Sequence, residues 1–298
     1  MRLERHDNAT SFLERADEFL LEREAQHNLM LGLSARLRTE PRLYGEEPYF
    51  AVALDGDRVV GAAMRTPPHN LILSEMDDDD ALEPIAEDAE SVFGSLPGVV
   101  GPKEPAGQFA RLWEARTGAS AAIGIQQRVY RASEAILPEG VSGSRRPYDE
   151  ADRDLVIAWM EAFVDEALPQ APPEDAEGWL ERSLANPDGG LELWVDEGRP
   201  VSFSGYGGLT PNGIRIGPVY TPPELRRRGY ASALVAEQTK MLLDGGRTFC
   251  FLFTDLANPT SNSIYQRVGY EPVSDADQWA FGPHSSETAP EQQEVEAP

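Results

Sequence analysis

The run Ile214-Arg215-Ile216-Gly217-Pro218-Val219-Tyr220, with the later Arg226-Arg227-Arg228-Gly229-Tyr230-Ala231, determines most of what this chain can be. A strand-like apolar run leads to a glycine-bearing turn, and Ser232-Ala233-Leu234-Val235 then continues as a helix. Such a turn leaves backbone N–H groups unpaired, and the helix dipole adds positive charge there. The stretch therefore predicts a site for phosphate oxygens. On these residues alone, a solvated helix start is the alternative.

The charge balance limits the partners. The 298-residue chain has 51 acidic and 26 basic residues, a formal net charge of −25. Binding a nucleic-acid backbone requires a basic face, so no nucleic-acid partner is expected. The acidic field favours a cationic or amine substrate. Against this background, three consecutive arginines form a compact basic cluster that suits an anion.

Cysteine and histidine usage argues against redox and metal chemistry. Cys250 is the only cysteine, so no disulfide can form within the chain, and its apolar neighbours predict a buried, inert thiol. The four histidines show no ligand spacing, so no metal is expected. Neither a signal peptide nor a membrane-spanning run is evident, and we expect a cytoplasmic protein without a membrane partner.

The pattern of elements occurs twice. Each half is predicted to contain helices, a hairpin, a strand, a helix, a strand, a helix and a final strand, in that order. The hairpin turns at Asp55-Gly56 and Glu197-Gly198 lie at equivalent places in the two halves. We therefore predict an α/β (mixed α+β) fold of two tandem domains, each a mostly antiparallel twisted sheet flanked by helices. The expected boundaries are 1–137, a linker at 138–144, a second domain at 145–282 and a disordered acidic tail at 283–298.

A second motif follows the arginine-glycine turn in the second half. Asn258-Pro259-Thr260-Ser261-Asn262-Ser263-Ile264-Tyr265 precedes the Gly269-Tyr270 pair. Together with R-x-x-G-x-A, this spacing resembles the GCN5-related N-acetyltransferase (GNAT) superfamily over roughly residues 145–282. The duplicated layout resembles its tandem members, in which one half is often degenerate.

The resemblance implies acetyl-CoA as co-substrate and gives the matched residues roles. Backbone amides at the turn would hold the pyrophosphate, the end of the preceding strand would bind the pantetheine arm and acetyl carbonyl, and Asn258 would bond the pantetheine. Tyr265 would be the general acid that protonates the departing thiolate. The implied cofactor-binding residues are Val219, Tyr220, Thr221, Arg226, Arg227, Arg228, Gly229, Tyr230, Ala231, Ser232, Asn258, Ser261 and Tyr265.

Structural alternatives exist for several of these residues. At least one of the three arginines is expected to be only solvated. Asn258 before Pro259 is also typical of a helix N-cap, Tyr265 could be core packing, and Ser261 could face cofactor or solvent. The strand before the turn lacks the glutamate that many relatives use as general base. The possible substitutes are Glu161, Asp165, Glu166, Glu192 and Asp255.

The first half fails the same comparison. Its turn reads Ser74-Glu75-Met76-Asp77-Asp78-Asp79-Asp80, with carboxylates and no glycine where the second half has arginines. Carboxylates would repel a pyrophosphate, so we predict that the first half binds no coenzyme A. The leading hypothesis is transfer of an acetyl group from acetyl-CoA to the amine of a small acceptor by direct attack in the second half. The alternative is an inactive coenzyme A-binding sensor or interaction protein.

Overall fold

The computed structural model describes residues 1–167 and 176–284, whose strands form one twelve-stranded sheet. The strand order is β1-β2-β3-β4-β5-β12-β6-β11-β10-β9-β8-β7. The first-half strands are β1 (Arg2–His6), β2 (Tyr49–Asp55), β3 (Arg58–Arg65), β4 (Leu71–Leu73), β5 (Gly98–Pro102) and β6 (Ala119–Ala132). The second-half strands are β7 (Ser144–Pro147), β8 (Gly190–Asp196), β9 (Arg199–Gly207), β10 (Gly213–Tyr220), β11 (Phe249–Asp255) and β12 (Glu271–His284).

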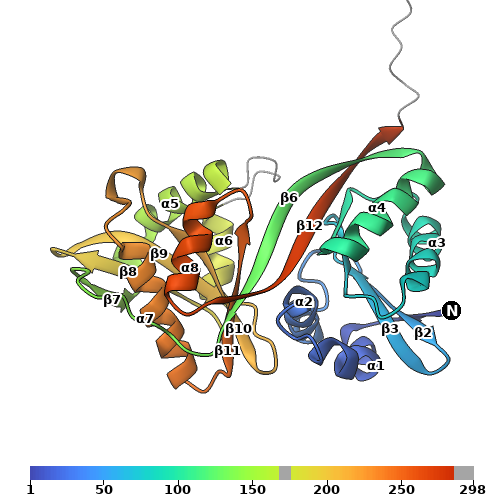
Figure 1. Ribbon diagram of the computed structural model, residues 1–298, viewed down its shortest axis with the longest axis horizontal. Helices are drawn as coiled ribbons and strands as arrows, with labels where there is room; N and C mark the ends of the chain where they lie inside the picture. Colours follow the sequence, from blue (N-terminus) through green and yellow to red (C-terminus); the bar gives the residue numbers. More distant parts are fainter. Residues whose placement is uncertain (168–175, 285–298) are drawn as a thin grey trace, which may run out of the picture.

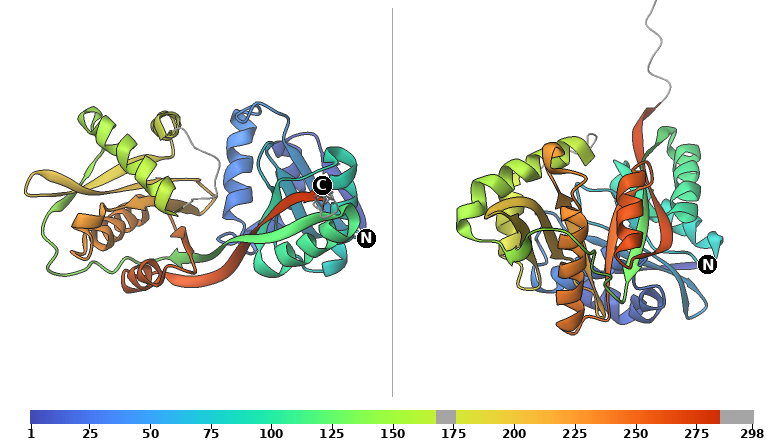
Figure 2. Two further views of the ribbon diagram at one scale, coloured as in Figure 1. Left: turned by 90° about the horizontal axis from the view of Figure 1, so that it is seen from above. Right: turned by 60° about the vertical axis from the view of Figure 1, so that its left-hand side comes forward.

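Helices cover both faces of the sheet (Figures 1 and 2). The first-half helices are α1 (Ala9–Leu21), α2 (Asn28–Thr39), α3 (Leu82–Phe93) and α4 (Lys103–Thr117). The second-half helices are α5 (Arg153–Ala167), α6 (Ala176–Leu184), α7 (Tyr230–Asp244) and α8 (Pro259–Arg267). Single 3-10 turns are η1 (Asp79–Ala81), η2 (Glu150–Asp152) and η3 (Pro223–Leu225).

The alternation of side chains along β2 explains the layers in the first half. Phe50 and Val52 pack into the core beneath α1 and α2, whereas Ala51 and Ala53 pack beneath α3 and α4. Successive side chains of a strand point to opposite faces, so an entirely apolar strand is covered on both sides. The second half repeats this arrangement: Leu193 belongs to the core with α5 and α6, and its neighbour Trp194 to the core with α7.

Both predicted hairpins are confirmed. The β2–β3 and β8–β9 pairs are antiparallel, and their turns place Gly56 (φ +60°), Glu197 (φ +49°) and Gly198 (φ +76°) in the left-handed region. Tight hairpin turns require positive φ, which explains the glycines. The short edge strands β1 and β7 were not predicted. Their charged sequences lack an apolar run, and pairing with β2 and β8 creates them.

The two halves exchange their last strands. β12 pairs with β5 of the first half, while β6 pairs with β11 of the second half, and β6 and β12 pair with each other. Figure 1 shows the long β6 and β12 crossing side by side between the halves. The expected linker lies at the covalent joint, but the hydrogen-bonded sheet continues through both segments that we expected to be separate domains. Of the expected tail, residues 283 and 284 complete β12, and the remainder lies outside the described residues.

Contacts beside the exchanged strands also join the halves. Glu24 is buried and accepts from both the backbone N–H and the side-chain amide of Asn212, each at 2.7 Å. The Arg131 guanidinium lies 4.4 Å from the ring centre of Phe249. These contacts hold the first half firmly beside the second.

Candidate functional site

A cleft opens where β10 and β11 diverge. Their parallel pairing covers only Gly213–Arg215 with Phe249–Phe251, and a bulge interrupts the pairing of β10 with β9 between Ile216 and Val219. Gly217 lies in this bulge with φ +137°, a conformation that suits glycine. Beyond it, the strands bound a cavity of about 900 Å³.

The cleft collects nearly all the predicted site residues. Of the thirteen, every one except Arg228 lines it. The other lining residues are Ile125, Gln127, Phe163, Glu166, Ala167, Ile216, Gly217, Pro218, Leu225, Phe253, Thr254, Asp255, Ile264 and Arg267. Ile125 and Gln127 belong to β6, so the first half completes the cleft of the second. Sequence patterns gave no sign of this, because the contribution depends on the strand exchange.

The turn before α7 forms a cradle of backbone donors. Arg227 (φ +64°) and Gly229 (φ +86°) both adopt left-handed conformations, and Gly229 is the N-cap of α7. Among the described residues, no hydrogen bond uses the N–H groups of residues 227–232. These donors stand at the positive end of a fifteen-residue helix. The arrangement fits an anion such as a pyrophosphate.

The three arginines have different surroundings. Arg226 donates through Nε to the carbonyl oxygen of Thr221 at 2.8 Å and through Nη2 to Glu166 at 2.6 Å. Arg227 lines the cleft, whereas Arg228 is exposed outside it. The charge of Arg228 instead acts on Asp196, whose pKa is lowered mainly by hydrogen bonds from Tyr230 and Ser142.

Helix α8 brings Asn258 and Tyr265 to the cleft. The Asn258 side chain accepts from the Ser261 N–H at 3.0 Å, so Asn258 is an N-cap as well as a lining residue. Half-buried Tyr265 has ring centres of Tyr130 and Tyr270 at 6.4 and 6.0 Å. Burial raises the pKa of Tyr265 to about 12. The phenol is therefore protonated at neutral pH and can donate a proton.

The structure separates the five carboxylates that could act as a base. Glu166 and Asp255 line the cleft, whereas Glu161 and Asp165 are exposed and do not. Glu192 lies in a different place, where it is buried against Arg145 with Oε2 2.5 Å from Nη1. Burial raises the pKa of Glu192, and Arg145 partly offsets this. Glu192 therefore forms a buried ion pair away from the cleft and is not placed to act as its base.

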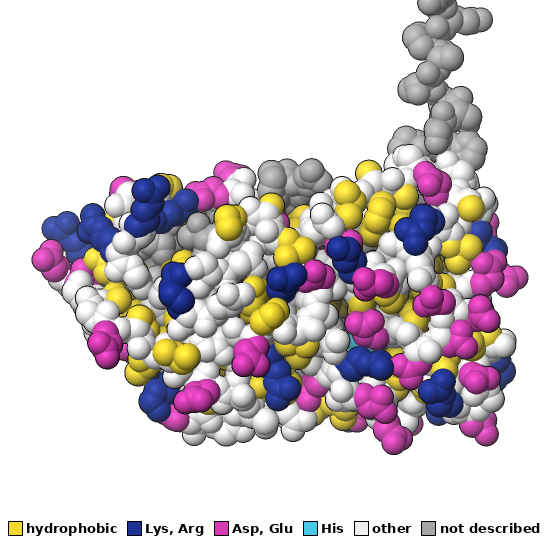
Figure 3. Space-filling view, in the orientation of Figure 1, with side chains coloured by type: hydrophobic (Ala, Val, Ile, Leu, Met, Phe, Trp, Pro, Cys, Tyr) yellow, Lys and Arg dark blue, Asp and Glu magenta, His cyan; other side chains and the backbone are white. Residues whose placement is uncertain are grey.

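Basic side chains are visible at the upper left of the second half, where Figure 1 shows the loop between β10 and α7 (Figure 3). Acidic side chains are spread over the first half in the same view. The cradle thus lies in the more basic part of this face. The turn thus gathers three arginines in a chain whose net charge is −25.

Comparison with known proteins identifies this architecture. Residues 207–280 match the family described as FR47-like protein, which is GNAT-related. A solved GNAT-family acetyltransferase from Colwellia psychrerythraea overlays with a TM-score of 0.57 at 11% identity, covering 94% of this chain and 100% of that one. Residues 207–280 thus match a GNAT-related family, and the chain has the fold of GNAT acetyltransferases.

Other GNAT and similar structures extend the likeness over the whole chain. A Drosophila protein overlays with a TM-score of 0.70 at 14% identity, covering 95% of this chain and 99% of that chain. A GCN5-related N-acetyltransferase from Kribbella flavida overlays with a TM-score of 0.54 at 17% identity, covering 85% and 95%. No curated protein matches the chain. At these identities the solved structures show the fold, which is that of acetyltransferases.

The first half of the chain has no comparable opening after β4. A Cβ atom on Gly101 of β5 would lie 2.9 Å from the Leu73 carbonyl oxygen, so β4 and β5 stay close together. The following residues continue to pair with β3, because Ser74 and Asp77 donate backbone N–H groups to Ala62 and Val60. This half therefore lacks the divergent strands that open the second-half cleft.

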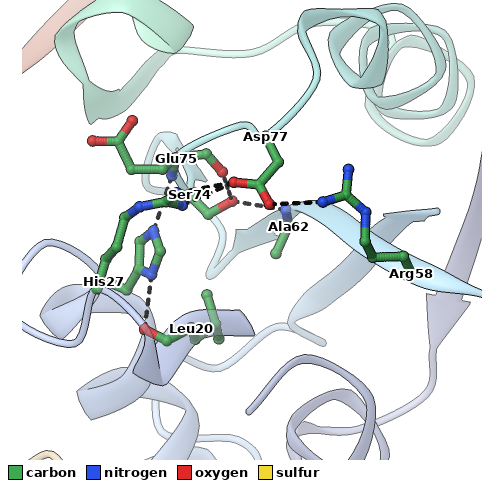
Figure 4. A network of polar contacts seen from close by, with 8 residues as sticks. Leu20, His27, Arg58, Ala62, Ser74, Glu75 and Asp77 are labelled. Atoms are coloured by element: carbon green, nitrogen blue, oxygen red, sulfur yellow. Dashed lines mark hydrogen bonds and ion pairs between the residues drawn. The ribbon is translucent and has the colours of Figure 1, made fainter. Parts of the chain in front are cut away.

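Side chains also fill the equivalent turn of the first half (Figure 4). His27 accepts from the Glu75 N–H at 3.0 Å and contacts the Leu20 carbonyl oxygen at 2.9 Å. Asp77 pairs with Arg23 at 3.0 Å and Arg58 at 3.4 Å. His27 thus takes up a backbone N–H that an anion-binding turn would leave free, and the two arginines pair with Asp77 and not with a ligand.

Cys250 is buried, and burial raises the pKa of its thiol to about 12, which agrees with the inert thiol expected from sequence. Within the described ranges, no group of histidine, cysteine and carboxylate side chains could hold a metal ion. The helices in the same ranges include none long and apolar enough to cross a membrane.

Proposed function

We propose that the chain is an N-acetyltransferase that transfers the acetyl group of acetyl-CoA to the amine of a small acceptor, in the cleft of the second half. The observation that carries the proposal is the joint presence, in one cleft, of the unpaired donors of residues 227–232 and the protonated phenol of Tyr265. Phosphate binding alone would not require a proton donor, and an acid alone would not require the cradle.

The residues fit the parts of acetyl-CoA. The donors at the start of α7 would hold the pyrophosphate, and Arg227 would add positive charge. The pantetheine arm would lie between the diverging ends of β10 and β11, with backbone groups of Val219, Tyr220 and Thr221 on one side and Asn258 on the other. A backbone N–H directed at the acetyl carbonyl would stabilise the oxyanion that develops during attack.

Direct transfer accounts for the proton movements. The neutral amine attacks the thioester carbonyl, a C–N bond forms and the C–S bond breaks. The departing sulfur takes a proton from Tyr265, and the nitrogen loses one proton, which restores the phenol either directly or by way of solvent. An acceptor that enters as an ammonium ion first loses another proton. The net products are an acetylated amine, free coenzyme A and, from the ammonium form, one proton.

A coenzyme A-binding protein without catalysis is the second candidate. It is favoured by one observation: β10 carries no carboxylate that could act as a base beside the thioester. The presence of Tyr265 in the cleft favours the enzyme instead.

The test is release of free thiol from acetyl-CoA in the presence of a panel of primary amines, with acetyl-CoA binding measured in parallel. We expect binding and amine-dependent thiol release. Binding without release on any amine would favour the non-catalytic candidate. Absence of binding would reject both.

A further inference from the structure

The carboxylate of Glu166 connects the end of α5 to the turn before α7. Its Oε2 accepts from Arg226 Nη2 at 2.6 Å, and its Oε1 accepts from the Tyr220 hydroxyl at 3.1 Å. Arg226 is also fixed at its Nε by the Thr221 carbonyl oxygen at 2.8 Å. The first arginine of the phosphate-competent turn is thus bound to a carboxylate of the same cleft.

This ion pair is accessible and can be exchanged. The side chains of Arg226 and Glu166 are 41% and 44% exposed. Pairs as exposed as this contribute little to stability because water screens them. A pyrophosphate carries more charge than one carboxylate and can accept two parallel hydrogen bonds from a guanidinium. A pyrophosphate on the neighbouring N–H groups would therefore compete well for Arg226.

If Arg226 turned from Glu166 to a pyrophosphate, the negative charge of Glu166 in the cleft wall would no longer be compensated. Glu166 would keep the Tyr220 hydroxyl but no cation, in a cleft whose lining also includes the apolar residues Phe163 and Ile125. A carboxylate that has lost its cation is free to pair with another cationic group, such as an ammonium ion. Asp255, the other carboxylate in the cleft, already accepts through Oδ1 from the Ala257 N–H at 2.7 Å.

We propose that Glu166 binds the acceptor in its ammonium form, before that group loses the proton that attack requires, and that Arg226 occupies Glu166 until acetyl-CoA is bound. This inference rests on the proposed function and names a cationic primary amine as its substrate class. The two ligands bind cooperatively, because the pyrophosphate removes the cation that competes with the acceptor. Glu166 therefore acts against coenzyme binding and in favour of acceptor binding.

The opposite signs of these two effects give a sharp test. Acetyl-CoA binding is measured by calorimetry for the wild-type protein, Glu166→Gln and Asp165→Asn. Asp165 is the matched control, because it is the adjacent residue of α5, is exposed and lies outside the cleft. We expect Glu166→Gln to bind acetyl-CoA about 3- to 10-fold more tightly than wild type, with Asp165→Asn unchanged. Equal or weaker binding by Glu166→Gln would overturn the inference.

The second measurement is kcat/KM for the best cationic amine of the panel at saturating acetyl-CoA. Glu166→Gln should lower it at least about 10-fold, mainly through KM, whereas Asp165→Asn should not. Damage to the fold would weaken the binding of both ligands. Tighter coenzyme binding together with a lower kcat/KM for the acceptor would therefore distinguish the proposed role of Glu166 from a general loss of structure. Unchanged kcat/KM in Glu166→Gln would overturn it. If wild type binds no acetyl-CoA, the proposed function itself fails; if it binds but the two variants behave alike, only this inference fails.

Discussion

Gln127 on β6 lies directly opposite Asp255 at the end of β11, and both residues line the cleft. Gln127 comes from the first half of the chain and Asp255 from the second. Both halves therefore contribute residues to the cleft, although the arginine-glycine turn and the Asn258-to-Tyr265 motif lie only in the second half. The pairing gives the first half a structural role in the site without requiring a ligand of its own.

Removal of the first half should abolish coenzyme binding. A chain that begins at residue 138 lacks β6, so β11 loses its antiparallel partner and the cleft loses Ile125 and Gln127. We expect no acetyl-CoA binding by calorimetry from this segment alone. Adding residues 1–137 as a separate chain is the control, since it supplies β6. Full affinity in the isolated segment would show that the second half is independent of the exchanged strand.

A carboxylate placed in the cradle should repel the coenzyme without harming the helix. Ser232 is the third residue of α7 and lines the cleft, and glutamate is favoured in the first turn of a helix. We expect Ser232→Glu to weaken acetyl-CoA binding at least about 10-fold, which corresponds to about 1.4 kcal/mol. Ser232→Gln is the matched uncharged control. If both variants bind equally well, the pyrophosphate does not lie at this helix start.

Ser232 is a better test position than Gly229. At Gly229, φ is +86° and a Cβ atom would lie 2.9 Å from Val141 Cγ2, so any side chain disturbs the turn. Weaker binding by Gly229→Glu would then combine strain with charge repulsion.

The arginines at positions 227 and 228 should behave differently despite being neighbours. Arg227 lines the cleft, whereas Arg228 does not. We expect Arg227→Ala to weaken acetyl-CoA binding about 3- to 10-fold at low salt, with a smaller effect at high salt because ions screen the charge. Arg228→Ala removes the same charge outside the cleft and should have little effect. Equal losses would mean that only the general field of the turn matters.

Tyr265→Phe should lower kcat about 100-fold while leaving acetyl-CoA affinity nearly unchanged, because it removes only the proton donor. With a Tyr265 pKa of about 12, ionisation of this phenol should not reduce activity below about pH 10. Tyr270→Phe is the control: it breaks the 2.8 Å hydrogen bond to Thr239 in the same aromatic cluster and should cost about 1 kcal/mol of stability, not kcat. Equal kcat values for the two variants would show that Tyr265 is not the general acid.

His27 should make stability depend on pH. Burial lowers its pKa to about 4, whereas the unfolded chain titrates near 6.5. Between these values the unfolded state binds a proton that the native state does not, so the free energy of unfolding decreases as pH falls from about 6.5 to about 4. The contribution reaches about 3 kcal/mol.

Urea unfolding at several pH values tests this prediction. His27→Gln should be less stable than wild type at pH 7, because the substitution alters the contacts of His27 with the Glu75 N–H and the Leu20 carbonyl oxygen. Its stability should, however, decline less on acidification. His69→Gln replaces an exposed histidine and should keep the wild-type pH dependence. Parallel curves for wild type and His27→Gln would contradict the role of His27.

Local sequence patterns predicted the hairpin turns and the turn before α7, because residues that are adjacent in the chain determine these features. Hairpin turns at Gly56 and Gly198 follow from the positive φ that tight turns require. The cradle at Gly229 follows from a strand, a turn and a helix start that are adjacent in the chain. The edge strands β1 and β7 were missed because their pairing partners, rather than their own side chains, produce them.

Within the site, the sequence placed Tyr265 and Asn258 correctly in the cleft but could not rank the carboxylates. Glu166 and Glu192 are both acidic residues near apolar ones in the sequence. Only packing shows that Glu166 reaches the cleft, whereas Glu192 is buried against Arg145. The environment of a side chain depends on contacts between residues that are far apart in the chain, and these contacts cannot be predicted from a single sequence.

The sequence by itself indicated the repeated order of elements and the half that contains the arginine-glycine turn and the Asn258-to-Tyr265 motif, whose binding of coenzyme A stays a prediction. These features depend on short-range order: apolar periodicity, turn chemistry and the spacing from Arg226 to Tyr265. The tertiary structure alone decided that β6 and β12 exchange places, that Gln127 completes the cleft and that Arg226 is held by Glu166. These outcomes depend on which strand edges meet, because backbone hydrogen bonding joins any compatible pair of edges and side-chain packing selects among them.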